Sequence, residues 1–176
     1  MPITRLNHAV LYVRDVEVSR AFYEDALGFA TLTHVPGQAA FLRAPGSTND
    51  HDLGIFQIGP GAGPSAAGRD TVGLYHLAWE VDTLEELGRL RDVLSARGAL
   101  VGASDHQTTK SLYARDPDGL EFEVCWVLPA SALTPEVVDA ARSGARPTAL
   151  DLDADKDRYG AQTRGGVGIS IPEPTG

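Results

Sequence analysis

Two histidines and one glutamate have the types and spacing that could hold a metal ion. His8 and His76 lie 68 residues apart, and each begins an apolar run followed by an acidic cap and an amphipathic stretch. Glu123 lies between Phe122 and Val124 on an apolar run, where an unpaired buried carboxylate would cost several kcal/mol. Two imidazoles and one carboxylate leave coordination positions open, which suits non-haem Fe(II) and its activation of O2. We therefore predict these three residues as metal ligands, for Fe(II) or for Mn(II).

Each member of this set has a simpler interpretation. Either histidine alone is more often a hydrogen-bonded strand residue, and only their matching places in the chain favour a shared site. Glu121 shares the face of Glu123 by the strand period of two, so it is a competing ligand or a solvated residue at the rim.

The elements that must position these residues form two half-repeats, each predicted as strand, helix and three strands. The strands of the first half are expected over 7–13, 29–35, 39–42 and 53–58. Those of the second half are expected over 74–81, 99–103, 111–115 and 120–127. Asp15 and Thr83 are the predicted N-caps of the two helices, and Gly28 and Gly98 the residues that end them. If the halves pack about a pseudo-twofold axis, both imidazoles meet in one cavity.

The same pattern predicts the domain organisation. Residues 1–128 are expected to form one domain, with module one over 4–58 and module two over 73–128. A linker rich in Gly, Pro and Ala joins them over 59–72. A short helix and a flexible acidic tail are expected over 129–176.

Composition excludes several classes of partner. Fifteen Lys and Arg against 24 Asp and Glu give a net charge of −9, which disfavours nucleic acid and anionic membrane surfaces. No apolar stretch approaches the roughly 18 residues that span a bilayer, and residues 1–5 lack the pattern of a signal peptide. Cys125 is the single cysteine and is expected to be a buried free thiol. These features predict a cytoplasmic protein.

The paired modules and the three predicted ligands resemble the vicinal oxygen chelate superfamily, which contains glyoxalases, bleomycin resistance proteins and dioxygenases. The run from His106 through Leu112-Tyr113 and Asp116-Pro117-Asp118-Gly119 to Glu123 is similar to the signature of type I extradiol ring-cleaving dioxygenases. The resemblance covers about residues 4–128. It implies an α+β fold in which paired βαβββ modules form an open, cupped mixed β-sheet around a metal site.

The resemblance also implies roles for further residues. His51 would be the acid/base that takes a proton from the diol, and His106 and Tyr113 would donate hydrogen bonds to the bound substrate. The implied reaction opens a catechol-type aromatic diol with O2 at Fe(II), in a protein expected to be a homodimer. A loop histidine at position 51 and an ordinary strand tyrosine at 113 are the simpler interpretations.

Two other functions remain open on the sequence. A glyoxalase-like metal-dependent isomerase or lyase usually needs a fourth ligand near the end of the first half, where the chain offers Gly54, Phe56 and Gln57 but no carboxylate. A metal-free protein that binds aromatic drugs, like the bleomycin resistance proteins, would not need His8, His76 and Glu123 together.

Overall fold

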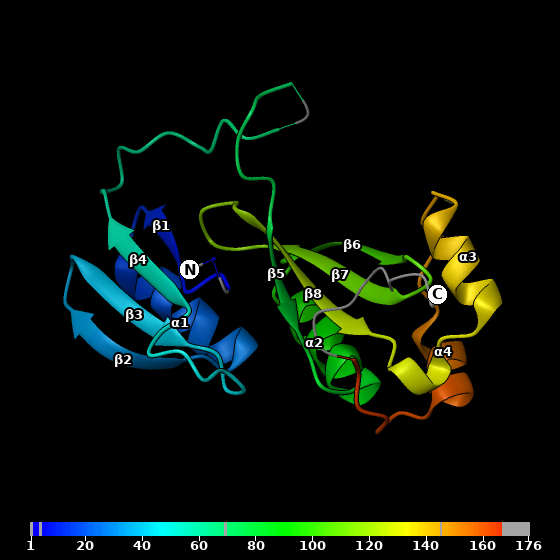
Figure 1. The fold of residues 1–176 in the computed structure, drawn as a ribbon. Helices are drawn as coiled ribbons and strands as arrows, with labels where there is room; N and C mark the ends of the chain where they lie inside the picture. Colours follow the sequence, from blue (N-terminus) through cyan, green and yellow to red (C-terminus); the bar gives the residue numbers. More distant parts are fainter. Residues whose placement is uncertain (1, 4, 69, 145, 167–176) are drawn as a thin grey trace. The chain divides into compact units, whose positions relative to one another are not determined.

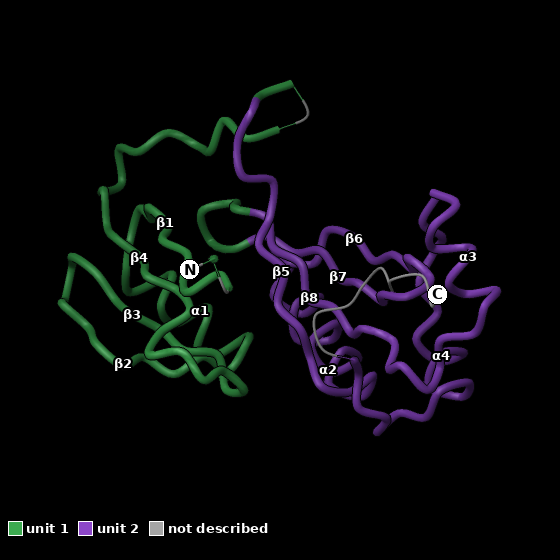
Figure 2. Tube along the Cα trace, in the orientation of Figure 1, with its two compact units in different colours: residues 1–71, 116–120 green, residues 72–115, 121–176 purple. Residues whose placement is uncertain are grey.

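The structure is a computed structural model that describes residues 2–3, 5–68, 70–144 and 146–166 (Figure 1). Its contacts divide the chain into two compact units, coloured separately in Figure 2. Unit 1 comprises residues 1–71 and 116–120, and unit 2 comprises residues 72–115 and 121–176.

Unit 1 is one βαβββ module with a helix over one face of a four-stranded sheet (Figure 1). Its elements are β1 (Ala9–Val13), α1 (Val16–Leu27), β2 (Ala30–Val35), β3 (Ala39–Arg43) and β4 (Leu53–Gln57). The strand order is β1-β4-β3-β2, in which β1 runs parallel to β4 and the other pairs are antiparallel.

The ends of α1 and the faces of β1 follow from local sequence. The Asp15 carboxylate accepts hydrogen bonds from the first turn of α1, and Gly28 ends the helix at φ 75°, as predicted. Because strand side chains alternate, Val13 is buried on one face of β1 while Tyr12 is exposed on the other. The face of β1 opposite its buried side therefore exposes the large side chains of Val10 and Tyr12.

Unit 2 repeats the module and extends it. Its elements are β5 (Leu77–Glu80), α2 (Leu84–Ala96), β6 (Leu100–Asp105), β7 (Thr109–Arg115) and β8 (Glu121–Val127), in the order β5-β8-β7-β6. Thr83 caps α2 as predicted, and the helix buries a stripe of leucines against the sheet. That stripe is Leu84, Leu87, Leu90 and Leu94.

The C-terminal part of unit 2 differs from the prediction. After the 3-10 turn η1 (Ala130–Ala132) come α3 (Pro135–Arg142) and α4 (Leu152–Tyr159), so the predicted flexible acidic tail contains a second helix. Asp151 caps α4, Leu152 is buried, and Asp155 pairs with a buried lysine of the sheet. Acidic residues favour a helix N-terminus, which explains why a segment poor in apolar residues is ordered. The last ten residues of the predicted tail lie outside the described residues.

The predicted fold class is confirmed. The chain is α+β with paired βαβββ modules, and each module carries its own open, mixed, four-stranded sheet. The turn at 116–120, which the sequence placed inside module two, makes its contacts with unit 1. The predicted domain boundaries otherwise stay a prediction. In the described part of the chain, none of the helices has the length and apolarity needed to cross a bilayer.

Candidate active site

A pocket of about 500 Å³ lies in unit 2, on the face of the sheet opposite α2. Residues of β5, β7, β8, the β6–β7 turn and α3 line it. Four of the predicted site residues are among them: His76, His106, Tyr113 and Glu123.

His76 and Glu123 form an ion pair in the lining of this pocket. The parallel register sets Ala78 of β5 opposite Glu123. His76 lies two residues before Ala78, so the side chains of His76 and Glu123 lie on one face of the sheet. His76 Nε2 is 3.0 Å from Glu123 Oε2. The hydroxyl of Ser111 donates to Glu123 Oε1 at 2.5 Å. Sequence reasoning missed Ser111, although its place two residues before Tyr113 on one strand was a signal that both share a face.

His106 and Tyr113 form a second polar pair beside the first. A hydrogen bond of 2.8 Å joins His106 Nε2 to the Tyr113 hydroxyl, and Tyr113 is the direct cross-strand neighbour of Glu123. Burial, followed by the charge of Glu123, raises the pKa of Tyr113 to about 12. The Tyr113 hydroxyl therefore keeps its proton at neutral pH and can donate it in a hydrogen bond.

The turn that carries His106 is braced from the other side of the sheet. Gln107 adopts φ 71°, and its backbone N–H donates to Asp105 Oδ1 at 2.7 Å. Lys110, almost fully buried, binds Asp105 at 2.5 Å and Asp155 of α4 at 3.2 Å. A buried ion pair thus holds the conformation of the turn on which His106 depends.

The other two predicted site residues lie together in unit 1. The rings of His8 and His51 are 4.5 Å apart, and His51 also meets the edge of Phe41. His51 Nδ1 is 3.1 Å from Asp50, and His8 Nδ1 is 2.7 Å from the Asn7 amide oxygen. The structure thus brings His8 and His51 together in one unit, and the remaining predicted residues together in the other.

The two units differ in the metal ligands they offer. Unit 2 has a carboxylate, Glu123, at the position where unit 1 has Gly54. In unit 2 the parallel register pairs Ala78 with Glu123, and in unit 1 the equivalent register pairs Val10 with Gly54. Gly54 offers no ligand. Gln57 is not available either, because its side-chain oxygen accepts from Val16 N at the start of α1. The position that an isomerase ligand would occupy is therefore not filled by a free polar side chain.

The competing carboxylate, Glu121, lies beside Arg115 at 3.8 Å and does not line the pocket. Among the described residues, no three His, Cys, Asp or Glu side chains gather closely enough to hold a metal ion by themselves. His76 and Glu123 nevertheless fit a divalent cation. His76 Nδ1 is buried without a hydrogen-bond partner, and an imidazole beside a carboxylate is a donor pair that Fe(II), Mn(II) and Zn(II) all accept.

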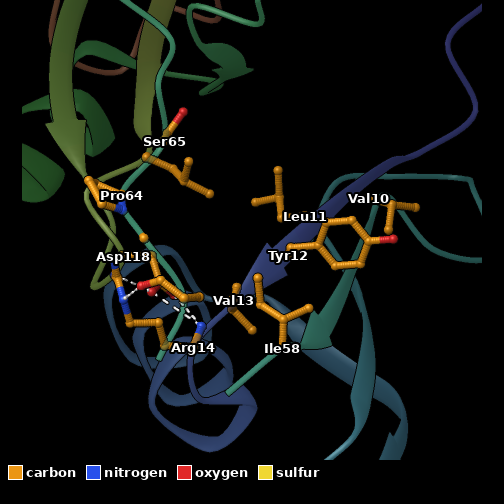
Figure 3. A pocket seen from close by; sticks show the side chains of 12 residues that line it. Val10, Leu11, Tyr12, Val13, Arg14, Ile58, Pro64, Ser65 and Asp118 are labelled. Atoms are coloured by element: carbon orange, nitrogen blue, oxygen red, sulfur yellow. Dashed lines mark hydrogen bonds and ion pairs between the residues drawn. The ribbon is translucent and has the colours of Figure 1, made fainter. Parts of the chain in front are cut away.

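A second pocket, of about 290 Å³, lies in unit 1 beside β1 (Figure 3). Its charged residues neutralise each other, since Arg14 Nη1 lies 2.8 Å from Asp118 Oδ1 and the Arg14 backbone N–H also donates to that carboxylate. Figure 3 shows this pair at one end and Tyr12, Val10 and Ile58 along the rest. Asp118 therefore holds the 116–120 turn against β1. This residue of the predicted dioxygenase signature thus has a structural role.

The sequence model of the Glyoxalase/Bleomycin resistance protein/Dioxygenase superfamily matches residues 5–124. A catechol-2,3-dioxygenase of Bacillus subtilis is 34% identical over 121 residues, which are 69% of this chain and 41% of that protein. The chain thus spans about two fifths of the length of that relative.

Solved structures show the same fold. A glyoxylase/bleomycin resistance protein/dioxygenase domain from Frankia sp. superposes with a TM-score of 0.62 at 22% identity, covering 73% of this chain and 96% of that one. A fosfomycin resistance protein from Listeria monocytogenes, solved with Mn(II), superposes with a TM-score of 0.54 at 20% identity, covering 77% and 95%. These likenesses establish the architecture alone, because several activities share it.

Proposed function

The chain belongs to the glyoxalase/bleomycin resistance protein/dioxygenase superfamily, and on that premise we propose that it is an Fe(II)-dependent extradiol dioxygenase. Its substrates would be a catechol-type aromatic diol and O2. The observation that carries the proposal is the His76–Glu123 pair in a pocket that also holds Tyr113 and His106. The 34% identity to a catechol-2,3-dioxygenase supports this chemistry over the others in the superfamily.

His76 and Glu123 would hold the metal, with His8 as the third ligand predicted from the repeat. A bound Fe(II) would supply adjacent coordination positions for the two diol oxygens and for O2, and Mn(II) accepts the same ligands. Ser111 contributes by orienting Glu123, because its hydroxyl donates to one carboxylate oxygen and leaves the other for His76 or a cation.

The remaining residues would handle protons and charge. His51 can donate its Nδ1 proton to Asp50, which leaves Nε2 as a base that takes a proton from a diol hydroxyl. Tyr113 stays protonated at neutral pH and would donate to oxygen atoms of the substrate that gain negative charge. His106, hydrogen-bonded to Tyr113, would orient that hydroxyl.

The test is oxygen consumption by the iron-loaded protein with catechol, alkylcatechols and 2,3-dihydroxybiphenyl, followed together with the yellow ring-opened product. We expect uptake and product in equal amounts, and their loss in Glu123→Ala and His76→Ala. Glu121→Gln is the matched control, because Glu121 lies on the same strand outside the pocket. His8→Ala and His51→Ala test the unit 1 residues.

Other outcomes would favour the other functions. Stoichiometric iron binding without oxygen uptake by any diol would favour a metal-dependent isomerase or lyase. Failure to bind any divalent metal would favour an aromatic drug-binding protein, in which Glu123→Ala leaves ligand affinity unchanged. A homodimer and a cytoplasmic location stay predictions of the sequence, and sedimentation velocity measures the first.

A further inference from the structure

Lys110 is a buried cation on β7 that lies next to the pocket but faces away from it. The residue is 3% exposed and does not line the pocket, whereas Thr109 and Tyr113 of the same strand do. Because side chains alternate along a strand, the Lys110 ammonium lies on the opposite face of the sheet. A buried charge is destabilising unless it is paired, so the partners of Lys110 determine what its burial stabilises.

The partners of Lys110 come from two elements far apart in the chain. Its Nζ lies 2.5 Å from Oδ2 of Asp105 in β6 and 3.2 Å from Oδ1 of Asp155 in α4. The ammonium also lies 5.7 Å from the centroid of the Tyr159 ring, at the end of α4. Helix α4 follows residues 5–124, which the family model matches. Lys110 therefore connects a helix outside the family domain to the last residue of β6.

The turn that follows β6 contains a strained residue. Among the described residues, Gln107 is the one non-glycine residue with a positive φ, at 71°. The Asp105 carboxylate joins this residue to the ion pair, because Oδ1 accepts from Gln107 N at 2.7 Å while Oδ2 binds Lys110. Thr148, which precedes α4, exchanges two backbone hydrogen bonds with the same aspartate. Lys110 thus fixes the carboxylate that holds Gln107 in its strained conformation.

The same turn forms part of the pocket wall. Its residues His106, Gln107, Thr108 and Thr109 all line the pocket. His106 Nε2 lies 2.8 Å from the Tyr113 hydroxyl. A displacement of the imidazole by about 1 Å would lengthen this contact beyond the range of a hydrogen bond. The conformation of the turn therefore decides whether His106 meets Tyr113.

We propose that Lys110 is a positioning residue of the active site, which holds the turn after β6 through Asp105 so that His106 meets the Tyr113 hydroxyl. Its effect on turnover rests on the proposed dioxygenase function, in which Tyr113 donates to substrate oxygens that gain negative charge. The place of the His106 ring does not depend on that function and can be measured in the metal-free protein.

The first test records the ring signals of the five histidines in the metal-free protein by two-dimensional 1H–15N NMR. Tyr113→Phe removes the hydrogen bond to His106 and so gives the signal of an imidazole without it. We expect the His106 signal of Lys110→Met to move toward that of Tyr113→Phe or to broaden. The signal of His34, which pairs with Glu17 in unit 1, should stay in place.

The second test separates positioning from stability. Adding Asp155→Asn to Lys110→Met recovers part of the lost stability, because it removes one unpaired buried charge. We expect kcat for catechol to be at least about tenfold lower in the single and in the double variant, with KM within about threefold. KM is spared because His76 and Glu123 lie outside the turn. Lys156→Met, which breaks an ion pair of α4 with α2, should change neither value.

Each outcome supports or overturns the positioning role. If kcat recovers together with stability in Lys110→Met/Asp155→Asn, Lys110 acts on stability alone and the inference is wrong. It is equally wrong if the His106 signal of the folded variants coincides with that of the wild-type protein. If Lys110→Met does not fold, the double variant carries both measurements. If the wild-type protein opens no diol but the His106 signal moves as expected, the positioning role stands and the dioxygenase proposal fails.

Discussion

At the scale of single residues, the geometry of Glu123 depends on one hydroxyl. Ser111 donates to Glu123 Oε1, while the hydroxyl of its neighbour Thr109 is buried without a hydrogen-bond partner. Ser111→Ala should weaken metal affinity roughly 10- to 100-fold, the usual effect of losing a group that orients a ligand. Thr109→Val, the control, removes no hydrogen bond and should leave affinity within about threefold. Competition with a fluorescent chelator measures both, and equal effects would contradict the assignment.

The reactivity of Cys125 is a second prediction at this scale. Burial, and then the charge of Glu123, raises the pKa of Cys125 to about 12. Because only the thiolate reacts, the alkylation rate should rise about tenfold for each pH unit between about pH 7 and 10 without reaching a plateau. Stopped-time alkylation with iodoacetamide, read by mass spectrometry, gives the profile. A plateau near about pH 8.5, the ordinary thiol value, would show that the environment of Cys125 is not as described.

At the scale of elements, Lys110 ties β7 to both the β6–β7 turn and α4. Its ammonium group pairs with Asp105 and Asp155, and burial raises the pKa of Asp155 despite that cation. Lys110→Met would leave two carboxylates close together without a buried cation, and we expect a loss of about 3–5 kcal/mol in the free energy of unfolding. Urea denaturation measures the loss.

The matched control for Lys110→Met is Lys156→Met. Lys156 lies on α4 and pairs with the exposed Glu85 at 2.8 Å, so its replacement should cost less than about 1 kcal/mol. Adding Asp155→Asn to Lys110→Met should recover part of the lost stability, because it removes one unpaired buried charge. Equal losses of unfolding free energy in Lys110→Met and Lys156→Met would mean that burial does not strengthen the ion pairs of Lys110.

At the scale of the whole molecule, the C-terminal segment completes unit 2. Residues 146–166 contribute the buried Leu152, one of the two carboxylates that pair with Lys110, and a backbone oxygen that accepts from Trp126 Nε1 at 3.2 Å. Truncation after Gly144 should therefore lower stability by about 3 kcal/mol or more, and lower Tm by roughly 6–12 °C. Differential scanning calorimetry measures the shift. An unchanged Tm would show that α4 is not bound to the sheet in solution.

The local sequence by itself determined the order of elements and their ends. Asp15, Gly28 and Thr83 act within one turn of the residues they cap, so their roles can be predicted without knowing the tertiary structure. The repeat likewise predicted matching places for His8 and His76, because a duplicated module repeats its register. The ligand role of His8 stays a prediction.

Only the tertiary structure decided which side chains share the pocket. Ser111 meets Glu123, and Ala140 reaches the pocket, through contacts between segments far apart in sequence. Such contacts depend on strand register and on where a later helix returns to the sheet, which no local pattern encodes. The order of α4 was missed for the same reason, since Asp155 of this helix pairs with Lys110, a residue more than forty positions earlier. Helix caps and hydrophobic periodicity act through interactions within a few residues of the chain, whereas the site is formed by side chains that the tertiary structure brings together.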